Sequence, residues 1–243
     1  PGRPWIHATR SSGGAYRGAM DIVILPDAEA LAVEATSRVL AEVEAHESLM
    51  LGLAGGSTPL ATHAALAAAP VDWTRVTAWI PDERWVPPND PNSNQRMMRE
   101  TLTDQTGIEL LAPDTTAGTP AAAATTYGDL VIPRLTDRDV RSVVMLGMGD
   151  DGHTASLFPG TVAEGNDTIS YVANFVPQHD TWRLTATLPL LAEADLVLFL
   201  VVGEGKASRI AEVHAGEDLP AARVTAKEAV VWLVDEAAAS RLS

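Results

Sequence analysis

A glycine-rich segment with a single histidine is the part of the sequence best suited to acid–base chemistry. It places His153 two residues after Asp151. The ordinary pKa of histidine suits proton transfer near neutral pH, and an adjacent carboxylate can orient the ring and stabilise its protonated form. We therefore predict that His153 is a general base oriented by Asp151. A turn or capping role for this histidine is the alternative that the spacing leaves open.

The same segment contains the pattern G-x-G-x-x-G after a predicted strand, which is typical of dinucleotide binding. Two features contradict that interpretation. Asp150 and Asp151 would place negative charge beside a pyrophosphate, and Pro159 would end a helix from Gly152 after about two turns. No acidic residue ends a second strand about 20 residues further on. We therefore predict that the protein uses no cofactor.

A second glycine segment is suited to binding phosphate. It follows an apolar run and consists of Gly55, Gly56, Ser57 and Thr58. Glycines let the backbone approach an anion, the N-terminus of a following helix offers free N–H groups, and the hydroxyls add donors. Pro59 suits the first turn of that helix. We predict phosphate binding here, with a tight turn and helix cap as the alternative.

Four further polar residues follow predicted strands or begin a predicted helix. Arg84 lies in an expected loop after one strand, at the edge where open α/β sheets bind ligands. Lys206, one of only two lysines, lies at a strand-to-helix junction, where it could act as a point charge for phosphate. Arg183 precedes an apolar run, and Asn94 could reach a polyol, although capping the helix from Ser93 is the favoured role for this stretch. Solvated turns and chance placement are the alternatives.

Composition excludes several classes of site and partner. The 243 residues contain no cysteine, which excludes disulfides, thiolate nucleophiles and iron–sulfur clusters. No H-E-x-x-H spacing suggests zinc, so we predict no metal. The net charge of −15 disfavours nucleic acids and anionic membranes, and the longest apolar run, residues 196–202, is too short to span a bilayer. We expect a small-molecule partner, a cytoplasmic location and, by preference, a monomer. The remaining histidines are expected on the surface or in packing: His7, His46, His63, His179 and His214.

Short apolar runs alternate with Ala-rich amphipathic segments from Met20 onward, which predicts an α/β fold with a mostly parallel sheet flanked by helices. Asp27 is expected to cap a helix that buries Leu31, Ala35, Val39 and Val43. Strands are predicted at residues 21–25, 49–54, 75–80, 142–147, 171–175, 196–202 and 230–234. Further helices are predicted at residues 59–68, 93–106, 121–135 and 206–215.

The chain is expected to form one domain over residues 20–243. No repeat of fixed period occurs, and the Pro- and Thr-rich stretch at 112–120 is too short to be a convincing linker. Residues 1–19 lack the apolar stretch of a secretory signal and are interpreted as a flexible leader or an addition ahead of Met20.

Five segments, taken together and in this order, resemble the 6-phosphogluconolactonase family. The resemblance runs from about Asp21 to Asp235, with no departure at a motif position. Its motifs are GGSTP (55–59), DER (82–84) with SN (93–94), GMGDDGHTASLFP (147–159), WRLT (182–185) and GEGKA (203–207).

The resemblance implies a single-domain, Rossmann-like fold shared with glucosamine-6-phosphate deaminase and ribose-5-phosphate isomerase. It also implies hydrolysis of 6-phospho-D-glucono-1,5-lactone in the oxidative pentose phosphate pathway, without a metal or a covalent intermediate. The loop at 55–58, Arg84, Asn94 and Lys206 would bind the phosphosugar, with Arg183 near the phosphate or the hydroxyls. His153, oriented by Asp151, would activate water. Backbone N–H groups of residues 149–152, or an arginine, would stabilise the oxyanion.

Two rival functions share this fold. Aminosugar-phosphate deaminases of the same fold resemble Asp-Glu-Tyr where this chain has Asp82-Glu83-Arg84, and His-Ile-Ala-Phe-Asn-Glu-Pro where it has residues 153–159, so the lactonase branch fits better. A sugar-phosphate sensor of a transcription regulator would need a DNA-binding segment, for which the leader is too short and the net charge unsuitable.

Overall fold

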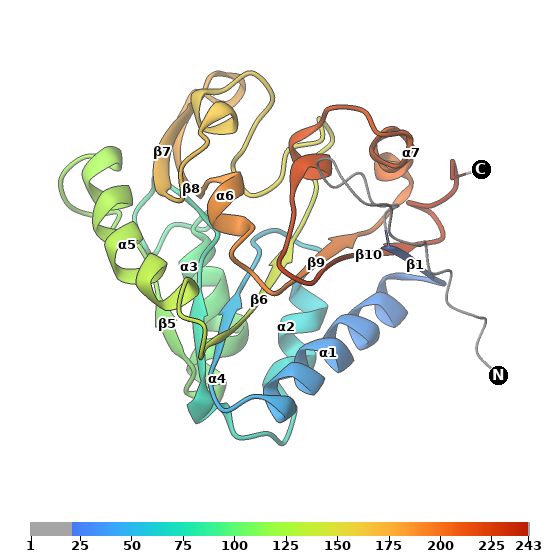
Figure 1. Ribbon diagram of the computed structural model, residues 1–243, viewed down its shortest axis with the longest axis horizontal. Helices are drawn as coiled ribbons and strands as arrows, with labels where there is room; N and C mark the ends of the chain where they lie inside the picture. Colours follow the sequence, from blue (N-terminus) through green and yellow to red (C-terminus); the bar gives the residue numbers. More distant parts are fainter. Residues whose placement is uncertain (1–20, 243) are drawn as a thin grey trace.

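The computed structural model describes residues 21–242, in which seven parallel strands form the main sheet (Figure 1). The strand order is β1-β10-β9-β6-β2-β3-β5. The central strands are apolar on both faces, as a sheet covered by helices on both sides requires. The bounds are β1 Asp21–Leu25, β2 Leu49–Gly52, β3 Val76–Trp79, β5 Glu109–Leu111, β6 Arg141–Leu146, β9 Leu196–Val201 and β10 Ala229–Asp235. The predicted α/β class with a mostly parallel sheet is confirmed.

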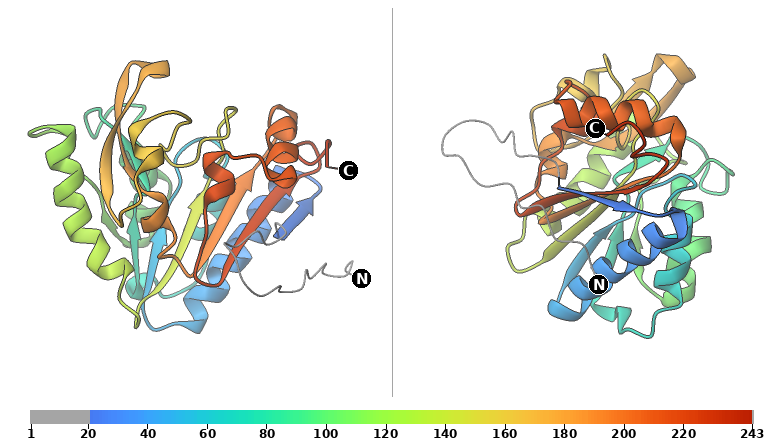
Figure 2. Two further views of the ribbon diagram at one scale, coloured as in Figure 1. Left: turned by 45° about the horizontal axis from the view of Figure 1, so that its top comes forward. Right: turned by 90° about the vertical axis from the view of Figure 1, so that its right-hand side faces the viewer.

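Helices pack on both faces of this sheet, and Figure 2 shows α1 and α7 on opposite sides of it. Asp27 accepts the N–H of Ala30 and caps α1 as predicted, and the four expected core residues of α1 are buried. The α-helices are α1 Ala28–Ala45, α2 Leu60–Ala67, α3 Asn94–Met98, α4 Asp104–Thr106, α5 Pro120–Leu135, α6 Leu188–Leu191 and α7 Ala207–Ala215. None of the described helices is long and apolar enough to cross a membrane.

Short helical turns complete the connections. The single helix predicted over residues 93–106 is wrong in detail, because the π-helical turn η2 Arg99–Thr103 separates α3 from α4. The 3-10 turns are η1 Trp73–Arg75, η3 Val162–Gly165, η4 Pro177–His179, η5 Glu204–Lys206 and η6 Pro220–Arg223.

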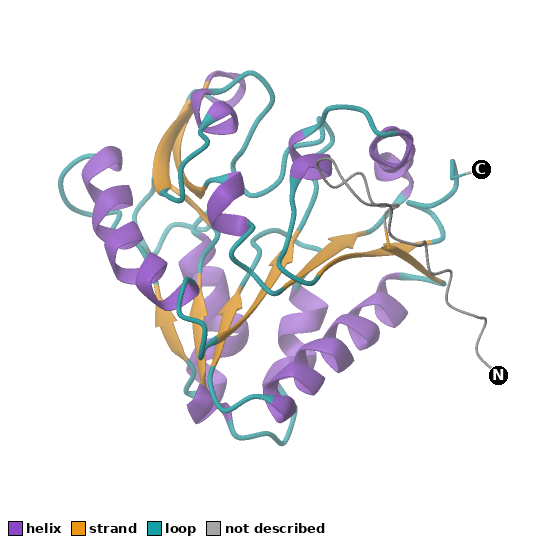
Figure 3. Cartoon of the chain, in the orientation of Figure 1, coloured by secondary structure: helices purple, strands orange, loops and turns teal. Residues whose placement is uncertain are grey.

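A second sheet, antiparallel and three-stranded, was not predicted. It consists of β4 Asp82–Arg84, β8 Thr181–Ala186 and β7 Tyr171–Val176, and β7 and β8 stand apart from the main sheet in Figure 3. The strand predicted at 171–175 therefore belongs here and not to the parallel sheet. The loop expected at Asp82-Glu83-Arg84 is a strand because β8 pairs with it. Tyr171 and Leu184 lie in the same buried cluster as Val197 of β9, so the two sheets share one core.

The division of the chain into a leader and one lactonase domain stays a prediction. Residues 1–19, and His7 among them, lie outside the described residues.

His63 on α2 is buried and has one hydrogen-bond partner. Its Nδ1 lies 3.2 Å from Thr101 Oγ1, while its Nε2 is buried without a partner. Burial disfavours the charged imidazolium and lowers the pKa of His63 from 6.5 to about 4. His63 is therefore neutral in the folded protein at neutral pH.

Replacing His63 by Leu should reduce the loss of stability at acidic pH. The unfolded chain binds the proton of His63 below about pH 6.5 and the folded chain only below about pH 4, so stability present at neutral pH is lost as the pH falls through this window. The contribution of His63 to the free energy of unfolding that is lost between neutral pH and pH 4 amounts to about 3 kcal/mol. Urea denaturation of both proteins from pH 7 to pH 4 measures it. His214→Leu, on the exposed end of α7, should leave the dependence of the unfolding free energy on pH as in wild type. If His63→Leu showed the same pH dependence as wild type, His63 would not be the group responsible.

Candidate active site

His153 lies on the loop that follows β6, and two neighbours fix its position. Its Nδ1 lies 2.6 Å from Asp151 Oδ1, and its backbone N–H donates to the same oxygen. Burial raises the pKa of Asp151, but the hydrogen bonds from His153 outweigh it and the pKa is lowered overall. Because a carboxylate can only accept, Nδ1 carries the hydrogen and Nε2 is left to accept a proton. The second neighbour is Gly149, where a Cβ would lie 2.1 Å from the imidazole ring.

Polar contacts hold this loop against the second sheet. Thr154 donates to the carbonyl of Gly147, and Ser156 donates its hydroxyl to Asp82 on β4 over 2.7 Å. The N–H of Ser156 also donates to Thr185 on β8. Sequence reasoning missed Asp82, Ser156 and Thr185 as contributors, although all three lie inside the quoted motifs. The loop of the candidate base is thereby joined to the strands that carry both predicted arginines.

Arg84 and Arg183 are direct neighbours across β4 and β8. Their Nε atoms are both buried without a hydrogen-bond partner, and no ion pair to a carboxylate is found for either within residues 21–242. Burial, and then the charge of Arg84, lowers the pKa of Arg183. Two neighbouring guanidinium groups that make no direct ion pair with a carboxylate are suited to binding an anion. The structure thus brings these two predicted residues together.

Glu83 is fully buried between these elements and fixes them. Its carboxylate accepts the backbone N–H groups of Arg84, Asn94 and Gln95, each over 2.7 Å, and the hydroxyl of Ser93. Burial raises the pKa of Glu83, opposed by those three N–H groups. Ser93 also caps α3 through the N–H of Arg96, as predicted. Sequence reasoning gave Glu83 no role, because nothing in the sequence marks it as buried.

The predicted phosphate loop lies against Asn94. The side chain of Asn94 donates to the carbonyl of Asp82, and a Cβ at Gly55 would lie 2.1 Å from Asn94 Oδ1. Gly56 has φ +96°, and a Cβ at this position would have no atom within 4 Å. The helix α2 begins at Leu60, one residue later than predicted, and no side chain caps it. Its first N–H groups therefore lack a side-chain partner, as an anion site requires.

Lys206 lies beside the loop of the candidate base. Its Nζ is 2.5 Å from Asp150 Oδ1, and Arg209 donates to the carbonyl of Asp150. The side chain of Asp150 is 85% exposed, so this ion pair is open to water and to exchange with another anion. Lys206 belongs to the turn η5, and the helix predicted from this residue begins at Ala207.

All of these groups except Arg183, which lies on β8 of the second sheet, follow the carboxyl ends of parallel strands. The loops after β2, β3, β6 and β9 carry, in turn, the glycine loop, the Asp82–Arg84 strand, the His153 loop and Lys206. Ligands bind at this edge in open α/β sheets. The hydrogen bond between Ser156 and Asp82 links the His153 and Lys206 group to the arginine group. The residues predicted separately thus occupy one region, while their roles stay predictions.

Of the two groups predicted to stabilise the oxyanion, the backbone N–H groups of residues 149–152 are the less suitable. The N–H groups of Gly149 and Gly152 donate within their own loop, to the carbonyls of His153 and Gly149. These two are therefore not free for a ligand, and an arginine is the stronger candidate. Within residues 21–242, no group of three or more histidine or acidic side chains is placed to bind a metal ion, and the absence of a cofactor stays a prediction.

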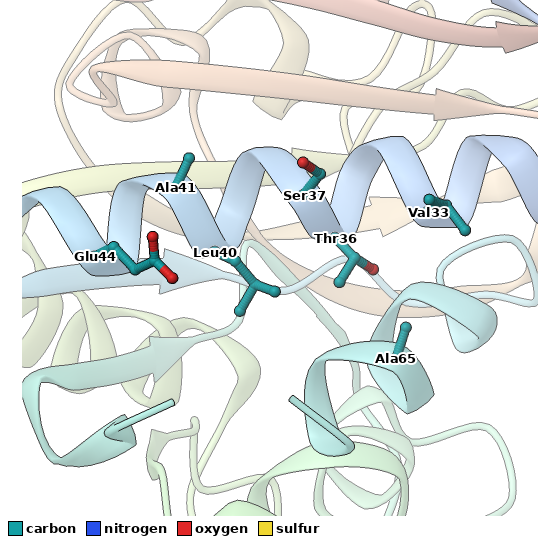
Figure 4. Close-up of a pocket in the computed structure, with 7 residues that line it drawn as sticks. All are labelled: Val33, Thr36, Ser37, Leu40, Ala41, Glu44 and Ala65. Carbon is teal, nitrogen blue, oxygen red and sulfur yellow. The ribbon is translucent and has the colours of Figure 1, made fainter. Parts of the chain in front are cut away.

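A groove between α1 and α2 lies away from this region. It has a volume of about 470 Å³, and Figure 4 shows Thr36 and Leu40 of α1 facing toward Ala65 of α2. Its lining contains one titratable side chain, Glu44, and no residue predicted to act in the site. The groove carries no acid–base chemistry.

Comparisons with known proteins agree on one family. The sequence model described as Glucosamine-6-phosphate isomerases/6-phosphogluconolactonase matches residues 26–232. The 6-phosphogluconolactonase of Nostoc sp. is 32% identical over 238 residues, which is 91% of this chain and 98% of that protein. That of Synechocystis sp. is 33% identical and covers 85% of this chain and 90% of its own length.

Solved structures show the same fold. The crystal structure of 6-phosphogluconolactonase from Thermotoga maritima superposes with a TM-score of 0.79 at 28% identity, covering 89% of this chain and 99% of that one. A monomeric glucosamine-6-phosphate deaminase superposes with a TM-score of 0.78 at 22% identity, covering 91% and 100%. The latter shows the fold alone.

Replacing Glu83 by Gln should destabilise the protein by roughly 2–3 kcal/mol, because the new amide group would face backbone donors that lose their acceptor. Urea denaturation measures the loss. The control is Glu100→Gln in η2, which breaks an exposed pair with Arg96 of α3 and should cost no more than about 0.5 kcal/mol. Equal values for the two variants would show that the Glu83 carboxylate does not hold β4 to α3.

Proposed function

The chain belongs to the glucosamine-6-phosphate isomerase/6-phosphogluconolactonase family, and we propose that it hydrolyses 6-phospho-D-glucono-1,5-lactone to 6-phospho-D-gluconate in the oxidative pentose phosphate pathway. The enzyme is a hydrolase that acts on a cyclic carboxylic ester. The observation that carries the proposal is the Asp151–His153 pair at 2.6 Å. It lies beside Lys206 and is linked through Ser156 to the strands of Arg84 and Arg183, whose Nε atoms have no hydrogen-bond partner.

The phosphate is bound by cations and by backbone donors. Arg84 and Lys206 supply charge, and the loop at 55–58 and the uncapped start of α2 supply N–H and hydroxyl donors. Arg183 binds the phosphate or the sugar hydroxyls, and Asn94 holds the glycine loop and faces the sugar. Because the carboxylate partner of Lys206, Asp150, is exposed, the substrate phosphate displaces Asp150 from the lysine when it binds.

His153 performs both proton transfers. Its Nε2 removes a proton from water as the water oxygen attacks the lactone carbonyl, and a tetrahedral oxyanion forms. The C–O bond to the ring oxygen then breaks, and the imidazolium returns its proton to that oxygen. Asp151 stabilises the imidazolium between the two steps, because it accepts the Nδ1 hydrogen. Arg84 or Arg183, each with a buried Nε that has no hydrogen-bond partner, stabilises the oxyanion.

The partner and location proposed with this reaction are a small phosphosugar lactone and the cytoplasm, with no nucleic acid or membrane partner. A monomer is proposed as the working state. Sedimentation tests the oligomeric state and cell fractionation tests the location, both independently of catalysis.

Replacing His153 by Ala should lower kcat on the order of 10²–10⁴-fold and leave KM largely unchanged, because water activation is lost while the phosphate contacts remain. The assay follows proton release from freshly generated lactone, corrected for spontaneous hydrolysis. His214→Ala, at the exposed end of α7, is the matched control. A near-normal kcat for His153→Ala would remove His153 from the role of base. A folded but inactive wild type would overturn the lactonase proposal, and ammonia release from glucosamine 6-phosphate would then be the next assay.

Replacing Lys206 by Ala should weaken binding of 6-phosphogluconate about tenfold or more, because a charge-assisted contact to the phosphate is lost. Calorimetric titration measures the affinity. The control is Lys227→Ala, which removes the other lysine of the chain, paired with Glu193. Unchanged affinity for Lys206→Ala would exclude its phosphate role.

A further inference from the structure

The aromatic ring of Phe158 covers one face of the His153 imidazole. The two ring centroids are 3.9 Å apart and the planes are inclined by 24°. Phe158 is almost fully buried, at 3% exposure. The chain turns back between the two residues at Ala155, which has φ +47°, and the N–H of Leu157 donates to the carbonyl of Thr154. This tight turn is what brings Phe158 over a histidine only five positions earlier.

The contact supplies a constraint that the other neighbours of His153 leave open. The ring is attached at Cβ, and the hydrogen bond from Nδ1 to Asp151 restrains it mainly within its own plane, so it can still tilt out of that plane. Gly149 limits the ring along its Cε1–Nδ1 edge. A flat, buried side chain against the face limits this tilt and so fixes the direction of Nε2. Water activation needs that direction fixed, because small displacements of a base are costly to proton transfer.

Phe158 is itself supported from the second sheet. His179 lies in the turn η4 between β7 and β8 and packs against Phe158, with ring centroids 5.5 Å apart and planes inclined by 72°. This perpendicular arrangement is favourable between aromatic rings. The turn continues directly into β8, which carries Arg183. The three rings therefore join the candidate base to the strand that carries a substrate-binding residue.

We propose that Phe158 is a positioning residue for His153, and that His179 at the β7–β8 turn holds Phe158 in place. The inference rests on the proposed function, because it takes His153 as the general base. Phe158 acts only through the imidazole. Its ring face also attracts a cation, so it stabilises His153 at the moment when the imidazole carries the proton.

Other charged groups also face this cluster. Asp151 contacts the ring of His153 from the same loop. Lys206 comes from the turn after β9 and is paired with Asp150. His179 packs against Phe158 with its ring plane inclined by 72°. The variants below leave Asp151, Asp150 and Lys206 unchanged, so a change in the pH profile reports on the three rings.

Phe158→Leu keeps an apolar side chain and removes the flat ring. We expect kcat to fall about tenfold with KM within about twofold of wild type, because the base is misdirected and the phosphate contacts are intact. The acid limb of the kcat/KM profile should move to lower pH by about half a unit, because the imidazolium loses the ring face. A role in stability alone would change the melting temperature and leave this limb in place.

A second pair of variants tests the support from the turn, and His179 is exposed, so both should fold. His179→Ala removes the contact with Phe158 and should lower kcat about threefold. His179→Phe keeps an aromatic ring without a titratable group and should restore kcat to near the wild-type value. Equal kcat values for these two variants would overturn the support by His179. They also decide whether the ring cluster matters if Phe158→Leu does not fold.

Nuclear magnetic resonance separates failure of this inference from failure of the proposed function. The Hε1 resonance of His153 should lie upfield in wild type, because of the Phe158 ring current, and move downfield in Phe158→Leu. An active wild type with unchanged kcat and acid limb in a folded Phe158→Leu overturns the positioning role alone. A wild type that does not accelerate lactone hydrolysis overturns the proposed function, whatever the resonance shows.

Discussion

The carboxylate of Glu83 is withdrawn from water, and three backbone N–H groups take the place of its hydration. An unpaired carboxylate at full burial would be very unfavourable, so the fold is committed to keeping those donors in position. Two of them belong to the start of α3 and one belongs to β4. The short strand and the helix therefore cannot separate without exposing the charge. The backbone positions of Arg84 and Asn94 are fixed as a result, because each of these residues supplies one of the N–H donors.

The second sheet extends this constraint to the candidate base. Register with β8 sets Arg183 opposite Arg84, and Asp82 and Thr185 are opposite each other one pair from Glu83. Asp82 and Thr185 both bond to Ser156, so the loop of His153 is held by the same pair of strands. A glycine-rich loop loses much conformational entropy on folding, and these polar contacts offset it. The buried carboxylate of Glu83 thus helps to position both the two arginines proposed to bind the substrate and the loop of the candidate base.

The sequence predicts the parts of this arrangement that depend on local spacing. The Asp151–His153 contact spans two residues, the core face of α1 repeats every four residues, and the run at 196–201 is apolar on both faces. The rest depends on contacts between distant segments. β4 is three polar residues that become a strand only because β8 pairs with them, and Gly55 meets Asn94 only after the sheet has formed. Phe158 reaches His153 because Ala155 has a positive φ, a conformation that cannot be predicted from an alanine in the sequence.

The distribution of charge explains how a protein with a net charge of −15 can bind a phosphosugar. The general field opposes the approach of an anion, so the attraction has to be local and short-ranged. Arg84 and Arg183 lie side by side with no direct ion pair to a carboxylate within residues 21–242. The repulsion between them, which the charges of Asp82 and Glu83 oppose, is relieved when the proposed anion binds. Lys206 is instead kept neutralised by an exposed carboxylate. In the proposed site, affinity comes from relief of repulsion at the arginines and from exchange of the carboxylate at the lysine, and neither requires a basic surface.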